Sequence, residues 1–113
     1  MIRLMHRTPD GQVSVDLPLD DLPALLQEPA GLLWLDLDGE PRETCRPILR
    51  ETFGFHPLAV DDALEQAHVP RVDDWADYLY LVLHAIQFDA QSDMHVRTVE
   101  LDVFLGRHYL VTY

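Results

Sequence analysis

The sequence predicts a mixed α/β domain, an α-β-α sandwich in which a sheet of parallel and antiparallel strands carries helices on both faces. Three observations support this prediction. Strand-like and helix-like segments alternate over the first 65 residues, and three or four longer strand-like segments follow. Residues 31–37 (GLLWLDL) form an apolar run bounded by glycines, typical of a strand covered on both faces. This order of segments requires at least one parallel crossover.

The N-terminal third predicts a hairpin followed by a short helix. Apolar and polar residues alternate in residues 2–4 and 13–17, on either side of a turn-forming segment at residues 8–11. Asp20 or Asp21 is placed to cap a helix over residues 19–26, with acidic side chains in its first turn. The strand at residues 31–37 then follows.

The remaining elements are read from the spacing of their apolar residues. Residues 42–53 have the three- and four-residue spacing of an amphipathic helix, and Gly54 is suited to end it. Pro57 occupies a favoured first position of a second helix. Strands are predicted from Val72 onward and at residues 78–88, 96–105 and 108–113.

Composition limits the kinds of partner. The 113 residues are 48% apolar, enough for one domain, and we expect a single soluble domain over residues 1–113. The formal charge is −12, and all eight basic residues are Arg, which argues against nucleic acid or an anionic membrane surface as partner. Cations remain as ligands, although solubility alone also explains an acidic surface. The single Cys45 fits a buried position in a reducing compartment.

Two acidic clusters are candidate cation sites. Asp61, Asp62 and Glu65 lie on the helix after Pro57, and Asp61 and Glu65 share one face. A hard divalent cation would relieve the repulsion between such carboxylates, so a weak magnesium or calcium site is one interpretation. The other is a solvated face whose acids lie favourably near the helix N-terminus. Asp73, Asp74 and Asp77 allow the same two interpretations.

An enzymatic alternative arises at the end of the apolar strand. Asp36 and Asp38 resemble the nucleophile and the residue that acts as both general acid and general base in haloacid-dehalogenase-type phosphohydrolases, which use magnesium to neutralise phosphate. Glu40 stands where that family has Thr or Val, and the chain has no lysine to bind phosphate. Gly-rich phosphate loops and Gly-x-Ser-x-Gly elbows are also missing from the sequence. We therefore expect no enzymatic activity.

A more extensive resemblance runs through the second half of the chain. Residues 53–64 (FGFHPLAVDDAL) and 70–83 (PRVDDWADYLYLVL) resemble the cytoplasmic N-terminal domain of the CorA family of magnesium and divalent-cation channels. Further matches are residues 34–37 (WLDL), 100–106 (ELDVFLG) and 110–112 (LVT), so the resemblance covers about residues 31 to 113. Val69 replaces the usual Arg of the family and Arg71 its usual Lys, and the acidic pair at 61 and 62 is intact.

The resemblance implies a role in transport. The family forms homopentamers in which domains of this kind build a cytoplasmic funnel, continued by a long helix and two membrane helices that we expect to lie outside these 113 residues. Asp62 matches the family's acid that holds a regulatory magnesium between subunits, with its main partner carboxylate on the long helix. Asp61 is a second candidate ligand. The resemblance thus implies weak regulatory Mg²⁺ and no organic cofactor, at the cytoplasmic face of the cell membrane.

Two alternatives to this function stay open. The chain could be a stand-alone acidic domain that mediates protein contacts without sensing metal, or a fragment of a phosphohydrolase using Asp36. Which divalent cation is transported is not predicted, because selectivity in the family is a property of the pore.

Overall fold

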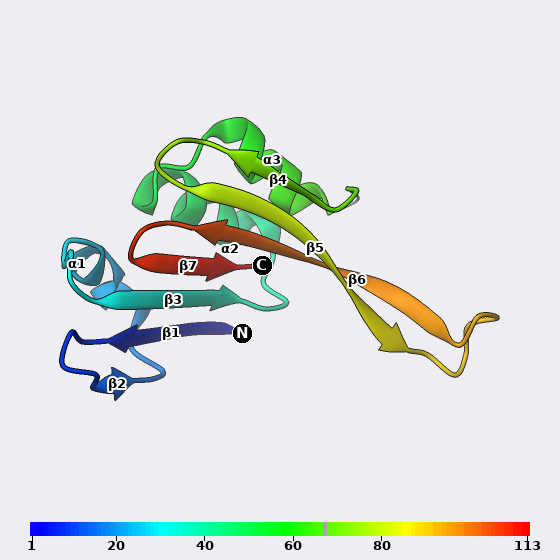
Figure 1. Cartoon of the computed structure of the whole chain (residues 1–113), viewed down its shortest axis with the longest axis horizontal. Coiled ribbons are helices and arrows are strands. Elements are labelled where there is room, and N and C mark those ends of the chain that lie inside the picture. Colours follow the sequence, from blue (N-terminus) through cyan, green and yellow to red (C-terminus); the bar gives the residue numbers. More distant parts are fainter. Residues whose placement is uncertain (67) are drawn as a thin grey trace.

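The computed structural model describes residues 1–66 and 68–113. Within these residues, seven strands form one sheet in the order β2-β1-β3-β7-β6-β5-β4 (Figure 1). Their bounds are β1 Ile2–Arg7, β2 Val13–Ser14, β3 Leu32–Leu37, β4 Arg71–Asp74, β5 Leu79–Phe88, β6 Val96–Leu105 and β7 Tyr109–Thr112. Strands β3 and β7 are parallel, and the other neighbouring pairs are antiparallel. The predicted α/β class, mixed sheet and parallel crossover are confirmed.

The helical segments lie where the sequence predicts them. They are the 3₁₀ turn η1 (Leu19–Asp21) with α1 (Leu22–Leu26), α2 (Arg42–Pro47) with the π turn η2 (Ile48–Thr52), and α3 (Pro57–Glu65). The single helix predicted over residues 42–53 is therefore an α-helix that widens into a π turn. Pro47 has no N–H to donate within α2, and beyond it the Phe53 N–H donates to the Ile48 carbonyl at 3.1 Å. No helix among the described residues is long and apolar enough to cross a membrane.

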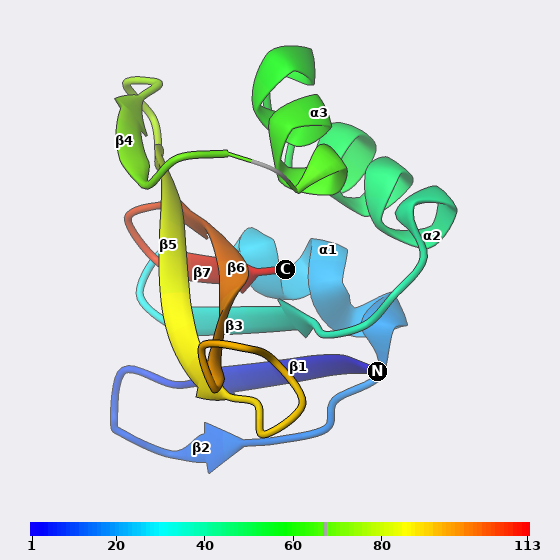
Figure 2. The ribbon, with the colours of Figure 1, turned by 90° about the vertical axis from the view of Figure 1, so that its right-hand side faces the viewer.

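The helices cover one face of the sheet (Figure 2). Leu33, Leu35 and Leu37 of β3 are buried in one core with apolar side chains from α1, α2, η2 and α3. The alternate residues Leu32 and Trp34 point to the other face, where they are 52% and 43% exposed. Of the two helical layers that the sequence predicts, the described residues form one. The run at β3 therefore alternates between buried and exposed positions, because no helix among the described residues covers the second face.

A long hairpin extends beyond the rest of the sheet (Figure 1). Strands β5 and β6 pair from Leu79 with Leu105 to Phe88 with Val96. Strand β4 pairs only with residues 79–82 of β5, and β7 only with residues 103–105 of β6, so the outer half of the hairpin has no neighbouring strand among the described residues. Its tip exposes Phe88 and Ile86 to solvent.

The aromatic core holds the corner between η2 and α3. Phe55 stacks on Phe104 of β6 with ring centroids 4.2 Å apart, and on Phe53 at 5.1 Å. Gly54 between them has a φ of +72°, a backbone conformation that glycine adopts without strain. The corner at residues 54–56, between the two helices that the sequence predicts, is therefore fixed by the core, and it sets the direction in which α3 leaves the sheet.

A candidate cation site at helix α3

The start of α3 is fixed by His56. Its Nδ1 accepts a hydrogen bond from the Leu58 N–H at 3.1 Å, which caps the helix, and its ring stacks on Trp75 with centroids 4.5 Å apart. The His56 N–H donates to Tyr78 Oη at 2.9 Å. The histidine thus joins α3 to the segment between β4 and β5, and positions the acidic face of the helix relative to β4.

The apolar face of α3 is buried and its acidic face points outward. Ala59, Val60, Ala63 and Leu64 belong to the core. Asp61 and Asp62 are partly exposed, and Glu65 is exposed. The helix therefore presents the carboxylates as the sequence predicts.

Each of the two candidate ligands is paired with an arginine from a different element. Asp61 Oδ1 lies 2.5 Å from Arg46 Nη1 of α2, and Asp62 Oδ2 lies 2.6 Å from Arg71 Nη2 of β4. The other Asp62 oxygen, Oδ1, lies 3.7 Å from His68 Nε2. Although adjacent in sequence, the two carboxylates engage separate partners.

Arg71 is held by more than Asp62. Its Nε donates to Asp73 Oδ2 at 3.0 Å, and its guanidinium carbon lies 5.5 Å from the centre of the Tyr80 ring. The hydrogen bond to Asp73 is the main reason why the pKa of Arg71 is raised. Asp73, in the second predicted acidic cluster, thus serves as an arginine partner. Asp74 of that cluster accepts a hydrogen bond from the Ala76 N–H, which stabilises the turn.

A histidine–glutamate network lies next to Asp62. Glu100 of β6 is 10% exposed; its Oε2 accepts a hydrogen bond from the His68 N–H at 3.0 Å, and its Oε1 lies 3.6 Å from His68 Nδ1. His84 Nε2 of β5 lies 3.8 Å from Glu100 Oε2 and 2.8 Å from the His68 carbonyl oxygen. This network links the chain after α3 to the base of the long hairpin. Sequence reasoning did not predict it, because His68, His84 and Glu100 show no local spacing pattern.

The residues present fit magnesium only in part. Carboxylate oxygen is the ligand that Mg²⁺ prefers, and this ion commonly keeps several waters and uses one or two protein carboxylates. Among the described residues, no group of three or more His, Cys, Asp or Glu side chains is arranged to hold a metal ion. A magnesium ion at Asp62 would therefore take one carboxylate from this chain and complete its shell with water or with ligands from elsewhere.

Asp36 has a structural partner. Its Oδ1 accepts a hydrogen bond from Thr112 Oγ1 at 2.7 Å, and the same hydroxyl oxygen accepts from Trp34 Nε1 at 3.0 Å. These bonds join the parallel strands β3 and β7. The main-chain carbonyl of Asp38 accepts from the amino group of Met1. The Asp-x-Asp segment is thus tied into the sheet at both acids.

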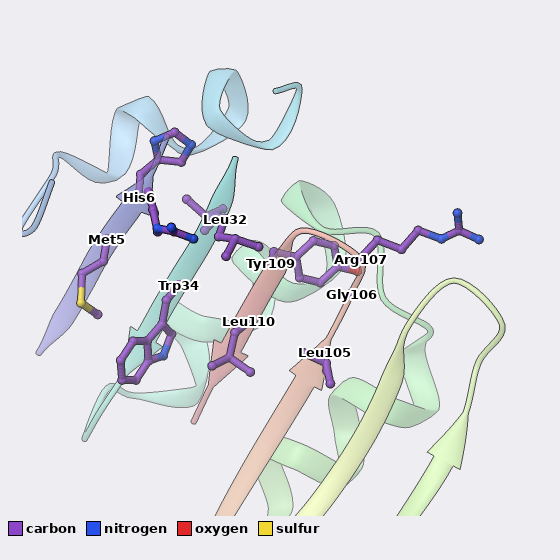
Figure 3. Close-up of a pocket in the computed structure, with 11 residues that line it drawn as sticks. Met5, His6, Leu32, Trp34, Leu105, Gly106, Arg107, Tyr109 and Leu110 are labelled. Carbon is purple, nitrogen blue, oxygen red and sulfur yellow. The ribbon is translucent and has the colours of Figure 1, made fainter. Parts of the chain in front are cut away.

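An apolar hollow lies away from these charged groups, on the uncovered face (Figure 3). Its apolar lining includes Met5, Leu32, Trp34, Leu105 and Leu110, from β1, β3, β6 and β7. Helix α3, the element to which Asp61 and Asp62 belong, lies over the opposite face of the sheet (Figure 2).

Comparisons with known proteins agree on one family. A family model described as CorA-like Mg²⁺ transporter protein matches residues 29–113. YfjQ of Bacillus subtilis (strain 168), named for metal ion transport, is 29% identical over 113 residues. The match covers all of this chain and 33% of YfjQ, so the chain spans about a third of that relative's length.

Solved structures share the fold. The full-length CmaX protein superposes with a TM-score of 0.72 at 23% identity, covering 96% of this chain and 33% of that one. The soluble domain of CorA from Methanocaldococcus jannaschii gives a TM-score of 0.61 at 16% identity, covering 96% of this chain and 39% of that one. The predicted resemblance to this family of domains is confirmed.

Proposed function

Because the chain belongs to the family of CorA-like Mg²⁺ transporter proteins, we propose that it is a cytoplasmic regulatory domain of a transporter for magnesium or another divalent cation. The proposed role is to sense Mg²⁺ at Asp62 and to influence the opening of the pore. It has no catalytic step.

The observation that carries the proposal is the placement of Asp62. Its side chain is 38% exposed on the outer face of α3. Arg71 binds its Oδ2, whereas its Oδ1 lies 3.7 Å from His68 Nε2, which is longer than a hydrogen bond. Because the side chain is partly exposed, a hard cation can reach the carboxylate of Asp62 from solvent. Asp61 is the weaker candidate, because its Oδ1 is engaged by Arg46 at 2.5 Å.

Weak binding is what a magnesium sensor requires. A site that responds to millimolar Mg²⁺ needs only about −4 kcal/mol of binding free energy, which a few carboxylates with mostly water ligands can supply. In the proposed homopentamer, a second carboxylate from a neighbouring subunit completes the site. Bound Mg²⁺ favours the closed assembly, and when Mg²⁺ is scarce the acidic surfaces repel and the open state gains population.

The test is a magnesium titration of this chain, followed by amide chemical shifts in NMR spectra, for the wild type, Asp62→Asn and Asp61→Asn. The expected result is a millimolar Kd that Asp62→Asn weakens at least about fivefold, and that Asp61→Asn, with the same charge change on the same helix, alters less. Micromolar affinity, or equal effects of the two substitutions, would contradict sensing at Asp62.

The uncovered apolar face favours a second candidate function, a domain for protein contacts without metal sensing. Leu32, Trp34 and Leu105 are each more than 40% exposed there, on strands of one sheet. Sedimentation with and without Mg²⁺ distinguishes the two functions. Self-association that depends on Mg²⁺ and on Asp62 supports the sensor, whereas self-association indifferent to both supports the contact domain.

A further inference from the structure

We infer that Arg71 is a built-in counter-cation that competes with Mg²⁺ for Asp62, and thereby sets the magnesium concentration at which this site fills. The inference rests on the proposed function, because it concerns the same carboxylate.

Arg71 has two kinds of contact: those that hold its side chain on the sheet, and the one with Asp62, which Mg²⁺ can replace. The guanidinium is anchored by the 3.0 Å bond from Nε to Asp73 and by the face of Tyr80. Asp73 and Tyr80 are paired residues on β4 and β5, so this anchor belongs to the sheet. The contact with Asp62, from Nη2 at 2.6 Å, crosses from the sheet to α3. Asp62 can therefore release Arg71 without leaving the arginine unpaired.

The competition follows from charge. With Arg71 in place, the charge of the Asp62 carboxylate is largely neutralised. A cation that approaches Oδ1 is also repelled by the positive guanidinium of Arg71, which is bound at Oδ2. Mg²⁺ must either displace the guanidinium or bind against its repulsion, and both weaken its affinity. Removal of the positive charge should therefore tighten magnesium binding, the opposite of what a ligand-supporting residue would show.

The same arrangement discriminates by charge number. A monovalent ion such as K⁺ brings no more charge than the guanidinium, which is already tethered at the site, so it has no advantage in displacing Arg71. A divalent ion has twice the charge on a small radius and can displace the guanidinium of Arg71 from Asp62. Asp62 should thus respond to divalent cations against a background of monovalent salt.

The experiment compares Arg71→Gln with Arg97→Gln in the magnesium titration of this chain, in about 0.1 M KCl. Both substitutions remove one positive charge, but Arg97 lies on the outer hairpin, where its Nε donates to Gln87 Oε1. Arg71→Gln should lower the Kd for Mg²⁺ about three- to tenfold, and Arg97→Gln should change it less than about twofold. The double substitution Arg71→Gln with Asp62→Asn should lose the gain.

A measurement on the wild type does not depend on the fold of a variant. The Nε–Hε resonance of Arg71 should move during the Mg²⁺ titration with the same midpoint as the Asp62 signals, and should not move during an equivalent KCl titration. In Asp62→Asn it should be insensitive to Mg²⁺. These outcomes support the exchange.

The two proposals fail in different ways. If wild type and Asp62→Asn bind Mg²⁺ equally, the sensing site is elsewhere, and the exchange is overturned with it. If binding depends on Asp62 but Arg71→Gln behaves like Arg97→Gln, or the Arg71 resonance stays fixed, sensing at Asp62 stands and the role of Arg71 is overturned.

Discussion

Tyr80 Oη donates a 2.5 Å hydrogen bond to Asp102 Oδ1, and both residues are fully buried. The other carboxylate oxygen of Asp102 has no hydrogen-bond partner among the described residues. Burial, the largest cause, raises the pKa of Asp102 to about 7, even though the bond from Tyr80 acts in the opposite direction. Burial also raises the pKa of the Tyr80 hydroxyl, which therefore remains a donor at neutral pH.

The first prediction is that the protein becomes less stable as pH rises from about 4 to about 7. At Asp102 the folded state binds more protons than the unfolded state in this window, because the pKa of this carboxyl is higher in the folded state. Its contribution to stability is complete below the unfolded pKa and is lost as pH rises through the folded pKa. Between about pH 5 and about pH 8 the loss should be about 2–3 kcal/mol. Urea unfolding at the two pH values measures it.

Asp102→Asn is the control for this dependence of the unfolding free energy on pH. The amide keeps an oxygen for Tyr80 and cannot ionise, so the pH dependence assigned to Asp102 should disappear and the variant should gain stability at the higher pH. An unchanged slope in the variant would assign the pH dependence to another group.

The second prediction concerns Gly106, in the turn between β6 and β7. A Cβ at this position would overlap the ring of Tyr109, which packs against Phe53 at a centroid distance of 5.3 Å. Gly106→Ala therefore forces the ring to move out of its packing position, and should lower the free energy of unfolding by about 2–3 kcal/mol. Chemical denaturation gives the value.

Gly39→Ala is a matched comparison. Gly39 has a φ of +67°, and a methyl group added there would have no described atom within 4 Å, so alanine meets only the backbone penalty, about 1 kcal/mol. If the two alanine variants lost equal stability, backbone strain and not the Tyr109 ring would account for Gly106.

The sequence predicts the elements of the site better than their pairing. Apolar spacing after Pro57 identifies α3 and places Asp61 and Asp62 on its solvent side, because both properties are local. The partners Arg46 and Arg71 come from α2 and β4, and their contacts depend on how these elements pack. Spacing along the chain contains no such information. The resemblance locates the acid pair but does not indicate that an arginine already neutralises each acid.

In the sheet, too, the sequence predicts the individual strands better than their arrangement. The strands predicted at residues 78–88 and 96–105 agree with β5 and β6 to within a residue at each end. Strands β3 and β7 are neighbours, and Leu33 pairs with Tyr109 although the two residues are far apart in the sequence. The sequence predicts that a parallel crossover exists but not which two strands it places side by side. The length of the hairpin beyond its neighbours is not predicted, because it depends on where β4 and β7 end.

The third prediction tests the link between those parallel strands. Thr112 Oγ1 accepts from Trp34 and donates to Asp36, so Thr112→Val removes two hydrogen bonds with little change of shape. The variant should lose about 1–2 kcal/mol of stability. Thr112→Ser, which keeps the hydroxyl, should lose less. Equal losses would attribute the effect to the methyl group rather than to the hydroxyl.

The fourth prediction concerns the cap of α3. His56→Ala removes the acceptor for the Leu58 N–H and the ring that stacks on Trp75, and should lower stability by about 1–2 kcal/mol. His56→Asn restores an acceptor suited to a helix N-cap but not the stack, so it should recover part of this loss. Hydrogen exchange separates the two effects, because the Leu58 amide should exchange faster in the alanine variant and near the wild-type rate in the asparagine variant. If the Leu58 amide exchanged alike in all three proteins, His56 would act through its stack on Trp75 alone. In that case the orientation of Asp62 would depend on the contact between Trp75 and His56 rather than on the first turn of α3.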